Sequence, residues 1–380
     1  MRIKKRFLGG GLIAGLVVAG AVFVYNAHER NDPWANRPPV TELERKVGQL
    51  ILVGFDGTQR SDEGVRAVSA QLRDGKIGGV TVMSRNIEDA AQFIDLTTHL
   101  KAQRSYNAAL IAVDQEGGRV QRVGGLDGAP AWIAPADMTL NSEDCDMEIA
   151  TRYYTQMAAH LPQFNINLNF GPVVDVNINP ENPVIGALNR SYSADPGTVA
   201  RCAEAFVRGH QAAGVLTSLK HFPGHGSANE DSHFALPFVE NVWDETELEP
   251  YQTMADGNLI DMIMMAHVVH SRFSDADDLP ASLSRKGVSA ARAIAGDDAV
   301  ILTDCLEMDA ISQRFTYEEA AVRALEAGND MVILTSYGRT DPGLGDRINA
   351  AIVDAVKDGR LSLAKLEQSI ERIENLKSRL

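Results

Sequence analysis

The chain alternates between short apolar runs and longer stretches in which apolar residues recur at helical spacing. A short apolar run bounded by glycine or polar residues is typical of a buried strand, and apolar residues three and four positions apart indicate an amphipathic helix. The predicted strands are residues 50–55, 79–83, 109–113, 166–170, 215–219, 261–265, 299–303 and 330–334. The predicted helices between them are residues 63–73, 90–104, 148–160, 196–213, 245–256 and 317–327, and residues 361–380 form a last packing helix.

Strands that alternate with helices pair in parallel, so the pattern predicts an α/β fold. Eight such units suit a closed (β/α)₈ TIM barrel, which we expect to form a single catalytic domain over residues 41–380. The competing architecture is a doubly wound open sheet. It is less favoured because no glycine-rich dinucleotide-binding turn follows an early strand.

The first forty residues differ from the rest of the chain. The opening MRIKKR carries four cations, and residues 7–24 then contain no charged side chain. A positive flank before an apolar stretch predicts an export signal over residues 1–25, either cleaved near Ala19-Gly20-Ala21 or retained as a membrane anchor. Residues 26–40 read as a polar linker. We therefore expect the protein outside the cytoplasm, in the periplasm or on the outer face of the cytoplasmic membrane.

Charge and cysteine content narrow the possible partners. The 380-residue chain has a formal net charge of -15, which argues against nucleic acid because no basic surplus exists to neutralise phosphates. Three scattered cysteines are too few for a zinc site. Cys145 and Cys202 each lie near the start of a predicted helix, and in an exported protein they could pair as a disulfide, with Cys305 left free. No cofactor fingerprint is present, so we expect no cofactor and no metal.

The stretch KHFPGHGSANEDSH, residues 220–233, concentrates the titratable groups. It follows the strand 215–219 directly, so Lys220 and His221 should emerge at the end of that strand. The glycines and the proline predict a turn, which places the Asp231-Ser232-His233 triplet on a loop. Clustered titratable groups on a loop above a strand end indicate a functional site.

Charged and histidine side chains follow most of the other predicted strands as well. On a barrel, the carboxyl ends of the strands form one face, and reactive residues gather there. These strand-end residues are Asp114, Glu116, Arg119 and Arg122 after the third strand, Asp175 and Arg190 after the fourth, His267 after the sixth and Asp304 after the seventh. Glu116 and Asp175 could equally serve the structure, by capping loops or pairing with an arginine.

These residue types suit the cleavage of an acetal. His233 can give and take a proton near neutral pH, and Asp231 could orient it. Asp304 is then a candidate nucleophile or stabiliser of an oxocarbenium-like transition state. One alternative is a metal-dependent hydrolase that uses His221, His225 and His233 with Asp304, although Lys220 would repel the metal cation. Another is a wall-binding protein without activity.

Several motifs together resemble glycoside hydrolase family 3, in particular its bacterial single-domain β-N-acetylhexosaminidases. They are KHFPGHG followed by DSH, AVDQEGGRVQR, NPVIG with a later RSYS, AHV, and the TD-x-L-x-M segment TDCLEM. The resemblance implies a retaining double displacement on terminal β-linked N-acetylglucosamine, typically from peptidoglycan fragments. It makes Asp304 the nucleophile and His233 the acid/base with Asp231 as its partner. It also makes Asp114, Arg122, Arg190, Lys220 and His221 sugar-binding residues.

The chain departs from the family pattern in two respects. The segment NPVIGALNRSYS has two more residues before Arg190 than the shorter family form, and an export segment precedes the barrel. Among glycosidases in general, a histidine is unusual as the acid, because a glutamic acid commonly serves in this role. One hypothesis is that a neutral base lets phosphate compete with water, so phosphorolysis of the same substrates is the alternative reaction.

Overall fold

The computed structural model of the chain describes residues 33–34, 37–103, 107–140, 144–335 and 341–380. The predicted export segment, residues 1–25, lies outside the described residues, and so does most of the predicted linker, 26–40. Residues 1–39 and residues 40–380 form separate units, and all the elements given below belong to the second. Within the described part of the chain, no helix is long and apolar enough to cross a membrane.

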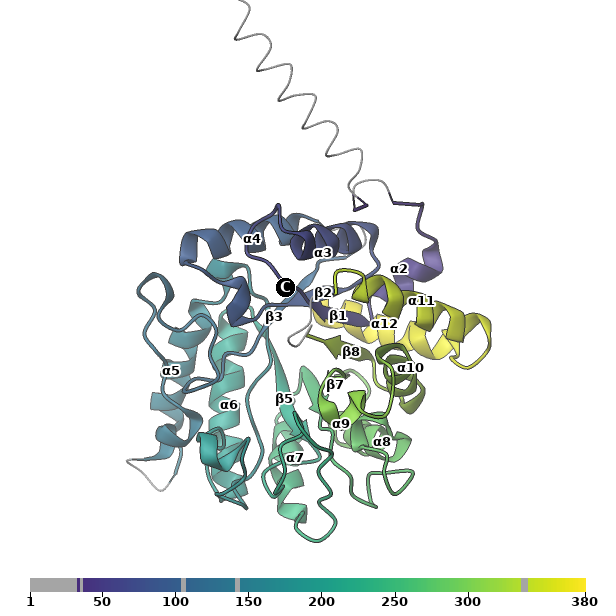
Figure 1. The fold of residues 1–380 in the computed structure, drawn as a ribbon. Coiled ribbons are helices and arrows are strands. Elements are labelled where there is room, and N and C mark those ends of the chain that lie inside the picture. The colour runs from purple at the N-terminus through teal and green to yellow at the C-terminus, as the bar shows by residue number, and fades with distance from the viewer. Residues whose placement is uncertain (1–32, 35–36, 104–106, 141–143, 336–340) are drawn as a thin grey trace, which may run out of the picture. The chain divides into compact units, whose positions relative to one another are not determined.

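Eight parallel strands close into a barrel, which confirms the predicted fold (Figure 1). Each strand pairs with the next along the chain, and the eighth pairs with the first through Ile51 and Val332. This closing pair excludes the open sheet. The strands are β1 Ile51–Gly54, β2 Gly79–Thr81, β3 Leu110–Val113, β4 Leu168–Asn169, β5 Leu216–Phe222, β6 Met262–Met265, β7 Val300–Cys305 and β8 Met331–Leu334.

The strands read as continuous apolar runs because helices cover the outside of the barrel and side chains fill its inside. Among the residues of the eight strands, Asp304 alone is not fully buried. Strand β5 continues past its predicted end at Leu219, because pairing with β6 includes Lys220 and Phe222, with a register shift between them. Lys220 and His221 are therefore strand residues and not loop residues.

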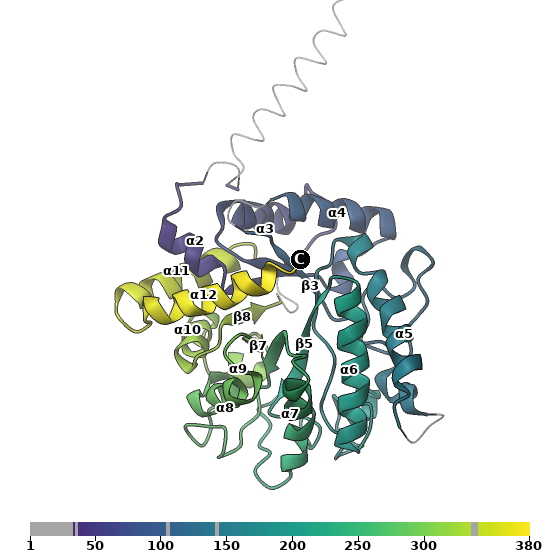
Figure 2. The ribbon, with the colours of Figure 1, turned by 180° about the vertical axis from the view of Figure 1, so that it is seen from behind.

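The helices lie around the barrel in both views (Figures 1 and 2). Each predicted helix is present, and the stretch 245–256 begins as a 3₁₀ turn over Glu245–Leu248 before its α-helical part. The α-helices are α2 Glu42–Gly48, α3 Glu63–Asp74, α4 Ala90–Ala102, α5 Met147–Ala159, α6 Pro196–Ala212, α7 Glu249–Asp256, α8 Arg285–Ala295, α9 Asp309–Ser312, α10 Tyr317–Ala327, α11 Leu344–Lys357 and α12 Leu363–Lys377.

Side-chain caps at the helix starts explain where several helices begin. Thr41 and Glu44 form a reciprocal capping box at the start of α2. The carboxylates of Asp89, Asp146 and Asp195 accept backbone hydrogen bonds at the starts of α4, α5 and α6. These polar residues stand directly before the apolar periodicity in the sequence, which is why the predicted starts agree closely with the observed ones.

A disulfide joins Cys145 to Cys202, the pairing that the sequence left open. Cys145 lies just before α5 and Cys202 lies within α6, and the two helices run side by side in both views (Figures 1 and 2). Cys305 is a free thiol in the interior, as expected.

The last helix, α12, closes the amino end of the barrel. Its predicted apolar stripe is buried except at Leu363, which is partly exposed. The Lys377 ammonium lies in the interior and donates to the Gln49 side chain and to the Gly78 carbonyl, both at 3.2 Å. Burial, only partly offset by Glu374, lowers the pKa of Lys377 to about 8. This lysine is thus held by neutral oxygens just before β1 and β2.

Candidate active site

A cavity of about 330 Å³ opens at the carboxyl ends of the strands. All eight residues that the family resemblance makes catalytic or sugar-binding line it, and they come from strands β3, β4, β5 and β7 or the loops after them. They are Asp114, Arg122, Arg190, Lys220, His221, Asp231, His233 and Asp304. The other strand-end residues Arg119, Asp175 and His267 do not line it. Asp304 and His233 thus line one shared cavity.

Five charged side chains form an ion cluster in this cavity: Asp114, Glu116, Arg122, Arg190 and Lys220. The Lys220 ammonium lies 2.9 Å from an Asp114 oxygen and 2.7 Å from a Glu116 oxygen. Arg190 donates two hydrogen bonds of 2.8 Å to Glu116 through Nε and Nη2. Arg122 contacts Asp114 more loosely, at 3.4 Å. Three cations thus face two carboxylates, and the lysine links both of them.

The electrostatics of the ion cluster keep both of its acids ionised. Burial alone would raise the pKa of Glu116, but Arg190 and Lys220 lower it to about 2. The same balance holds the pKa of Asp114 below its usual value, with Lys220 as the strongest lowering influence. The cluster therefore offers fixed carboxylate acceptors and cationic donors, which suits the binding of hydroxyl groups.

Arg190 reaches the cluster despite the two additional residues that precede it. A 3₁₀ turn over Gly186–Leu188 takes up the extra length, and Asn189 follows in the left-handed conformation at φ 56°. The Arg190 backbone N–H then closes the loop by donating to the Ile185 carbonyl at 3.1 Å. The Arg190 guanidinium therefore lies against Glu116. Glu116 thus pairs with an arginine, which was the structural role considered for it from the sequence.

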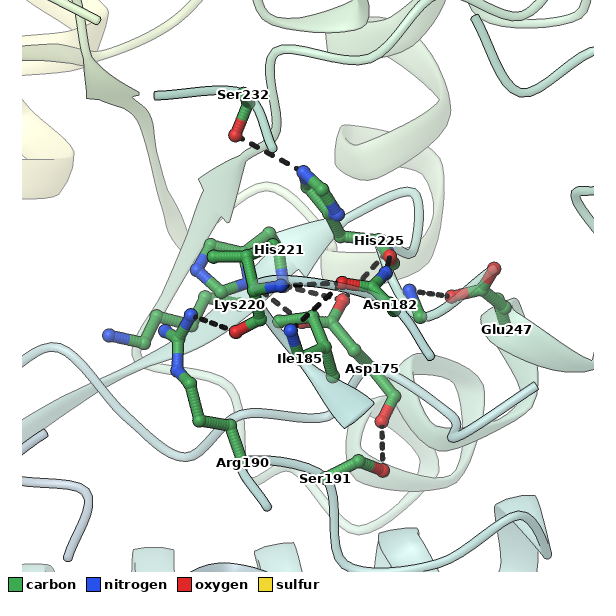
Figure 3. A network of polar contacts seen from close by, with 12 residues as sticks. Asp175, Asn182, Ile185, Arg190, Ser191, Lys220, His221, His225, Ser232 and Glu247 are labelled. Atoms are coloured by element: carbon green, nitrogen blue, oxygen red, sulfur yellow. Dashed lines mark hydrogen bonds and ion pairs between the residues drawn. The ribbon is translucent and has the colours of Figure 1, made fainter. Parts of the chain in front are cut away.

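Asp175 positions His221 from beneath the site (Figure 3). Its side chain is 0% exposed. One oxygen accepts from the His221 Nδ1–H at 2.7 Å, and the other accepts the backbone N–H groups of His221 and His225 at 3.1 and 2.8 Å. This contact fixes the ring so that its Nε2 atom is left for other partners. The sequence left open whether Asp175 is a site residue or a structural residue. Its contacts are structural, because it holds His221 and the backbone of His225 in place.

Asp304 is the next-to-last residue of strand β7, and its side chain is partly open to the cavity. Its Oδ1 accepts the Cys305 backbone N–H at 2.7 Å. Burial would raise the pKa of Asp304, but the nearby histidines, His221 first, lower it below its usual value. The group is therefore an anion that is poorly hydrated, which suits attack on or stabilisation of a positive carbon centre.

His233 and Asp231 form a hydrogen-bonded pair on the loop after β5. The His233 Nδ1–H donates to Asp231 Oδ1 at 2.7 Å, and the same oxygen accepts the His233 backbone N–H at 2.9 Å. The His233 side chain is 37% exposed, so its Nε2 atom can reach a ligand and solvent. This arrangement suits general acid and base catalysis, because the carboxylate orients the ring and fixes its tautomer.

The loop that carries His233 rests on the segment that follows Asp304. The backbone N–H groups of Asp309 and Ala310, at the start of α9, donate to the carbonyls of His233 and Ser232 at 3.3 and 3.4 Å. From the other side, His225 contacts the Ser232 hydroxyl at 3.1 Å (Figure 3). Two separate supports thus place the histidine loop relative to the end of β7.

Two polar side chains that sequence reasoning passed over hold the turn between Lys220 and Asp231. Asn182 donates to the His225 carbonyl at 2.6 Å. Glu247 accepts from the Gly226 N–H at 2.8 Å (Figure 3). It also accepts from the Ser227 hydroxyl at 2.6 Å. Burial raises the pKa of Glu247 to about 8. Asn182 is the first residue of the NPVIG motif, so the sequence offered a reason to include it among the site residues. Glu247 belongs to no such motif, and the sequence around it does not indicate its role.

The histidines are arranged differently from a metal site. His221 and His233 each use Nδ1 on a carboxylate, and His225 uses Nε2 on Ser232. No group of three or more histidine, cysteine or acidic side chains in the described ranges could hold a metal ion. His267, expected on the same face, is fully buried, and its Nε2–H donates to the Cys305 carbonyl at 2.9 Å. His267 thus holds the end of β7 in place, and its side chain does not line the cavity.

Comparisons with known proteins agree on one family. The family model described as the glycosyl hydrolase family 3 N terminal domain matches residues 42–376. The chain is 32% identical over 323 residues to Beta-hexosaminidase A of Pseudoalteromonas piscicida, covering 80% of this chain and 54% of that protein. It is 32% identical over 340 residues to Beta-hexosaminidase of Xylella fastidiosa (strain 9a5c), covering 87% of this chain and 98% of that protein.

A solved structure of the same family is similar to this chain. The glycoside hydrolase family 3 beta-N-acetylglucosaminidase from Paenibacillus sp. str. FPU-7 superimposes with a TM-score of 0.80 at 35% identity, covering 90% of this chain and 63% of that chain. The chain thus spans about half the length of the Pseudoalteromonas protein and under two thirds of the Paenibacillus one. The matched residues include every strand of the barrel and the eight candidate site residues, and the chain belongs to glycosyl hydrolase family 3.

Proposed function

We propose that the protein is a retaining exo-acting β-N-acetylhexosaminidase that releases terminal β-linked N-acetylglucosamine. The observation that carries the proposal is that an ionised carboxylate, Asp304, and a carboxylate-oriented imidazole, His233, open into the same cavity. Relatives named beta-hexosaminidase and beta-N-acetylglucosaminidase support the choice of sugar. Substrate class and activity of this chain rest on that similarity and on the chemistry of the site.

The first half-reaction forms a covalent sugar ester. The Asp304 carboxylate attacks the anomeric carbon while His233, in its charged form, gives its Nε2 proton to the glycosidic oxygen, and the bond to the leaving alcohol breaks. Asp231 accepts from Nδ1 throughout, so it holds the ring in one orientation during the transfer and in the correct tautomer after it.

The second half-reaction returns the enzyme to its starting state. Neutral His233 takes a proton from a water molecule, and the resulting oxygen nucleophile attacks the anomeric carbon and displaces Asp304. Two inversions leave the product with the configuration of the substrate. The regenerated charged imidazole and free carboxylate then begin the next cycle.

The ion cluster and His221 hold the sugar ring in this proposal. Lys220 and Arg190 donate and Asp114 accepts, so neighbouring hydroxyls of one sugar can be bound from both sides. A cavity of about 330 Å³ suits a single sugar unit better than a run of linked sugars. Release of one terminal residue, and not cleavage within a chain, is the mode that this size supports.

We further propose that the enzyme acts outside the cytoplasm on peptidoglycan or its fragments. Support comes from the cationic and apolar opening of the chain, residues 1–24, which predicts export with or without retention as a membrane anchor. The disulfide between Cys145 and Cys202 agrees, because such bonds persist mainly in oxidising compartments. Cleavage of a C-terminally tagged protein by protease added to intact spheroplasts tests this location, and full protection would contradict it.

Trapping of the covalent intermediate tests the reaction. A fluorinated β-N-acetylglucosaminide with a good leaving group should leave one sugar on the peptide that contains Asp304, and Asp304→Asn should form no adduct. An adduct on another residue, or product with inverted configuration, would refute the assignment. Turnover in the presence of phosphate, with a search for sugar 1-phosphate, separates hydrolysis from phosphorolysis.

A further inference from the structure

We propose that Phe234 forms the binding surface for the leaving-group sugar, so that this side chain sets the preference of the enzyme for a second sugar ring over a small alcohol. The inference rests on the proposed function, because it assigns the part of the substrate that departs. It names the substrate class on that side as a pyranose ring that presents its C–H face.

Phe234 is an exposed aromatic side chain at the mouth of the cavity. It is 67% exposed and yet lines the same cavity as Asp304 and Lys220, which lie deeper. Its ring centroid lies 6.4 Å from that of His233, with the two planes at 49°. Single exposed aromatic side chains are common on protein surfaces, but this one lies beside the general acid at a cavity mouth, where an apolar ring can pack against a ligand.

The position of His233 identifies which part of the substrate Phe234 meets. A general acid must lie within hydrogen-bond reach of the glycosidic oxygen, and that oxygen joins the bound sugar to the leaving group. The bound sugar occupies the buried, charged part of the cavity around Lys220. A side chain that adjoins the acid on its solvent side therefore faces the leaving group.

The loop holds Phe234 in place before any ligand arrives. The backbone N–H groups of Phe234 and Ala235 both donate to the Asp231 carbonyl at 3.0 Å. The carbonyl of His233 is fixed in turn by the Asp309 N–H at 3.3 Å. A flat apolar ring with few rotatable bonds on a fixed backbone loses little entropy on binding, which favours stacking against the C–H face of a sugar.

Phe238 on the same loop provides a matched control. It is 56% exposed but does not line the catalytic cavity, and a backbone bridge pairs it with Val269. Truncation of either phenylalanine removes the same apolar surface from the same loop. A different effect of the two changes therefore reports position and not loop stability.

The test compares two substrates whose departing oxygens have similar basicity, a methyl β-N-acetylglucosaminide and a β-1,4-linked N-acetylglucosamine disaccharide. We expect Phe234→Ala to lower kcat/KM for the disaccharide about tenfold and to leave the methyl glycoside within about twofold. Phe234→Trp should restore the disaccharide, and Phe238→Ala should affect neither substrate. Trapped glycosyl-enzyme should react with water at the wild-type rate in Phe234→Ala but more slowly with added N-acetylglucosamine as acceptor.

Two results would overturn the inference. An equal loss for both substrates would mean that Phe234 supports His233, and no loss for either would mean that the ring lies clear of the leaving group. Failure of the wild-type protein to hydrolyse either substrate would instead refute the proposed function itself.

Discussion

Replacement of Glu116 by glutamine tests the electrostatic account of the ion cluster. The Glu116 side chain is 1% exposed and accepts hydrogen bonds from Arg190 at 2.8 Å and from Lys220 at 2.7 Å. These two cations lower its pKa from 4.5 to about 2 against the opposing effect of burial. At roughly 1.4 kcal/mol per pH unit, the shift corresponds to about 3 kcal/mol of folding free energy at neutral pH. Glutamine imitates the protonated acid, so Glu116→Gln should lose about that amount.

The pH dependence gives the prediction its sign. The folded pKa lies below the unfolded one, so the stabilisation is fully present above pH 4.5 and is lost as the pH falls toward 2. The variant cannot titrate at this site. Urea unfolding at pH 7 should therefore show the full difference between wild type and Glu116→Gln, and at pH 3.5 the difference should be smaller by about 1.4 kcal/mol.

A surface pair supplies the control for this measurement. Glu326 pairs with Arg360 at 2.9 Å, but the two side chains are 30% and 41% exposed. Glu326→Gln should cost less than about 1 kcal/mol because solvent screens the exposed pair. The reasoning would be refuted if Glu116→Gln were as stable as the wild type at pH 7, or if its deficit did not change with pH.

Three further predictions concern other parts of the molecule. His233→Ala should spare substrates with good leaving groups and slow those with poor ones, and equal losses in steady-state kinetics would exclude His233 as the acid. Cys202→Ser opens a covalent link between residues 57 positions apart, so it should cost about 4 kcal/mol in urea unfolding, whereas unaltered stability would show that the bond is not formed. Lys377 has a folded pKa of about 8 below its unfolded 10.5, so this site stabilises the fold fully above pH 10.5 and loses that contribution as the pH falls to 8. The stability of the wild type relative to Lys377→Met should accordingly rise by about 1 to 2 kcal/mol between pH 8 and 9.5, and a constant difference would contradict the burial argument.

The sequence was sufficient to predict the barrel and the charged and histidine residues at the centre of its cavity. Parallel strands that are buried on both faces must be apolar runs, so the eight strands stand out against the amphipathic helices. A barrel then brings the residues that follow those runs to one end, which is why the sequence alone predicts that Asp114 and Asp304 lie in one site. The residue types at these positions completed the prediction.

The supports beneath the site could not be predicted in the same way. Asp175 and Glu247 act through contacts with backbone N–H groups 46 and 21 positions away, and no local pattern reveals such a partner. The sequence also did not predict that β5 extends through Lys220, for a related reason. A lysine in the sequence normally predicts the end of a buried strand, because an unpaired charge is rarely buried. Lys220 can be buried because it pairs with Asp114 and Glu116, and the sequence does not show that these carboxylates are close.

The placement of α12 has a practical consequence for handling the protein. Lys377 contacts residues that precede β1 and β2, so the chain ends near the amino side of the barrel, whereas the cavity opens at the carboxyl side. A purification tag added after Leu380 would therefore attach the barrel to a resin or sensor chip by its closed base. Immobilised in this orientation, the protein would keep the entrance of its cavity turned toward the solution.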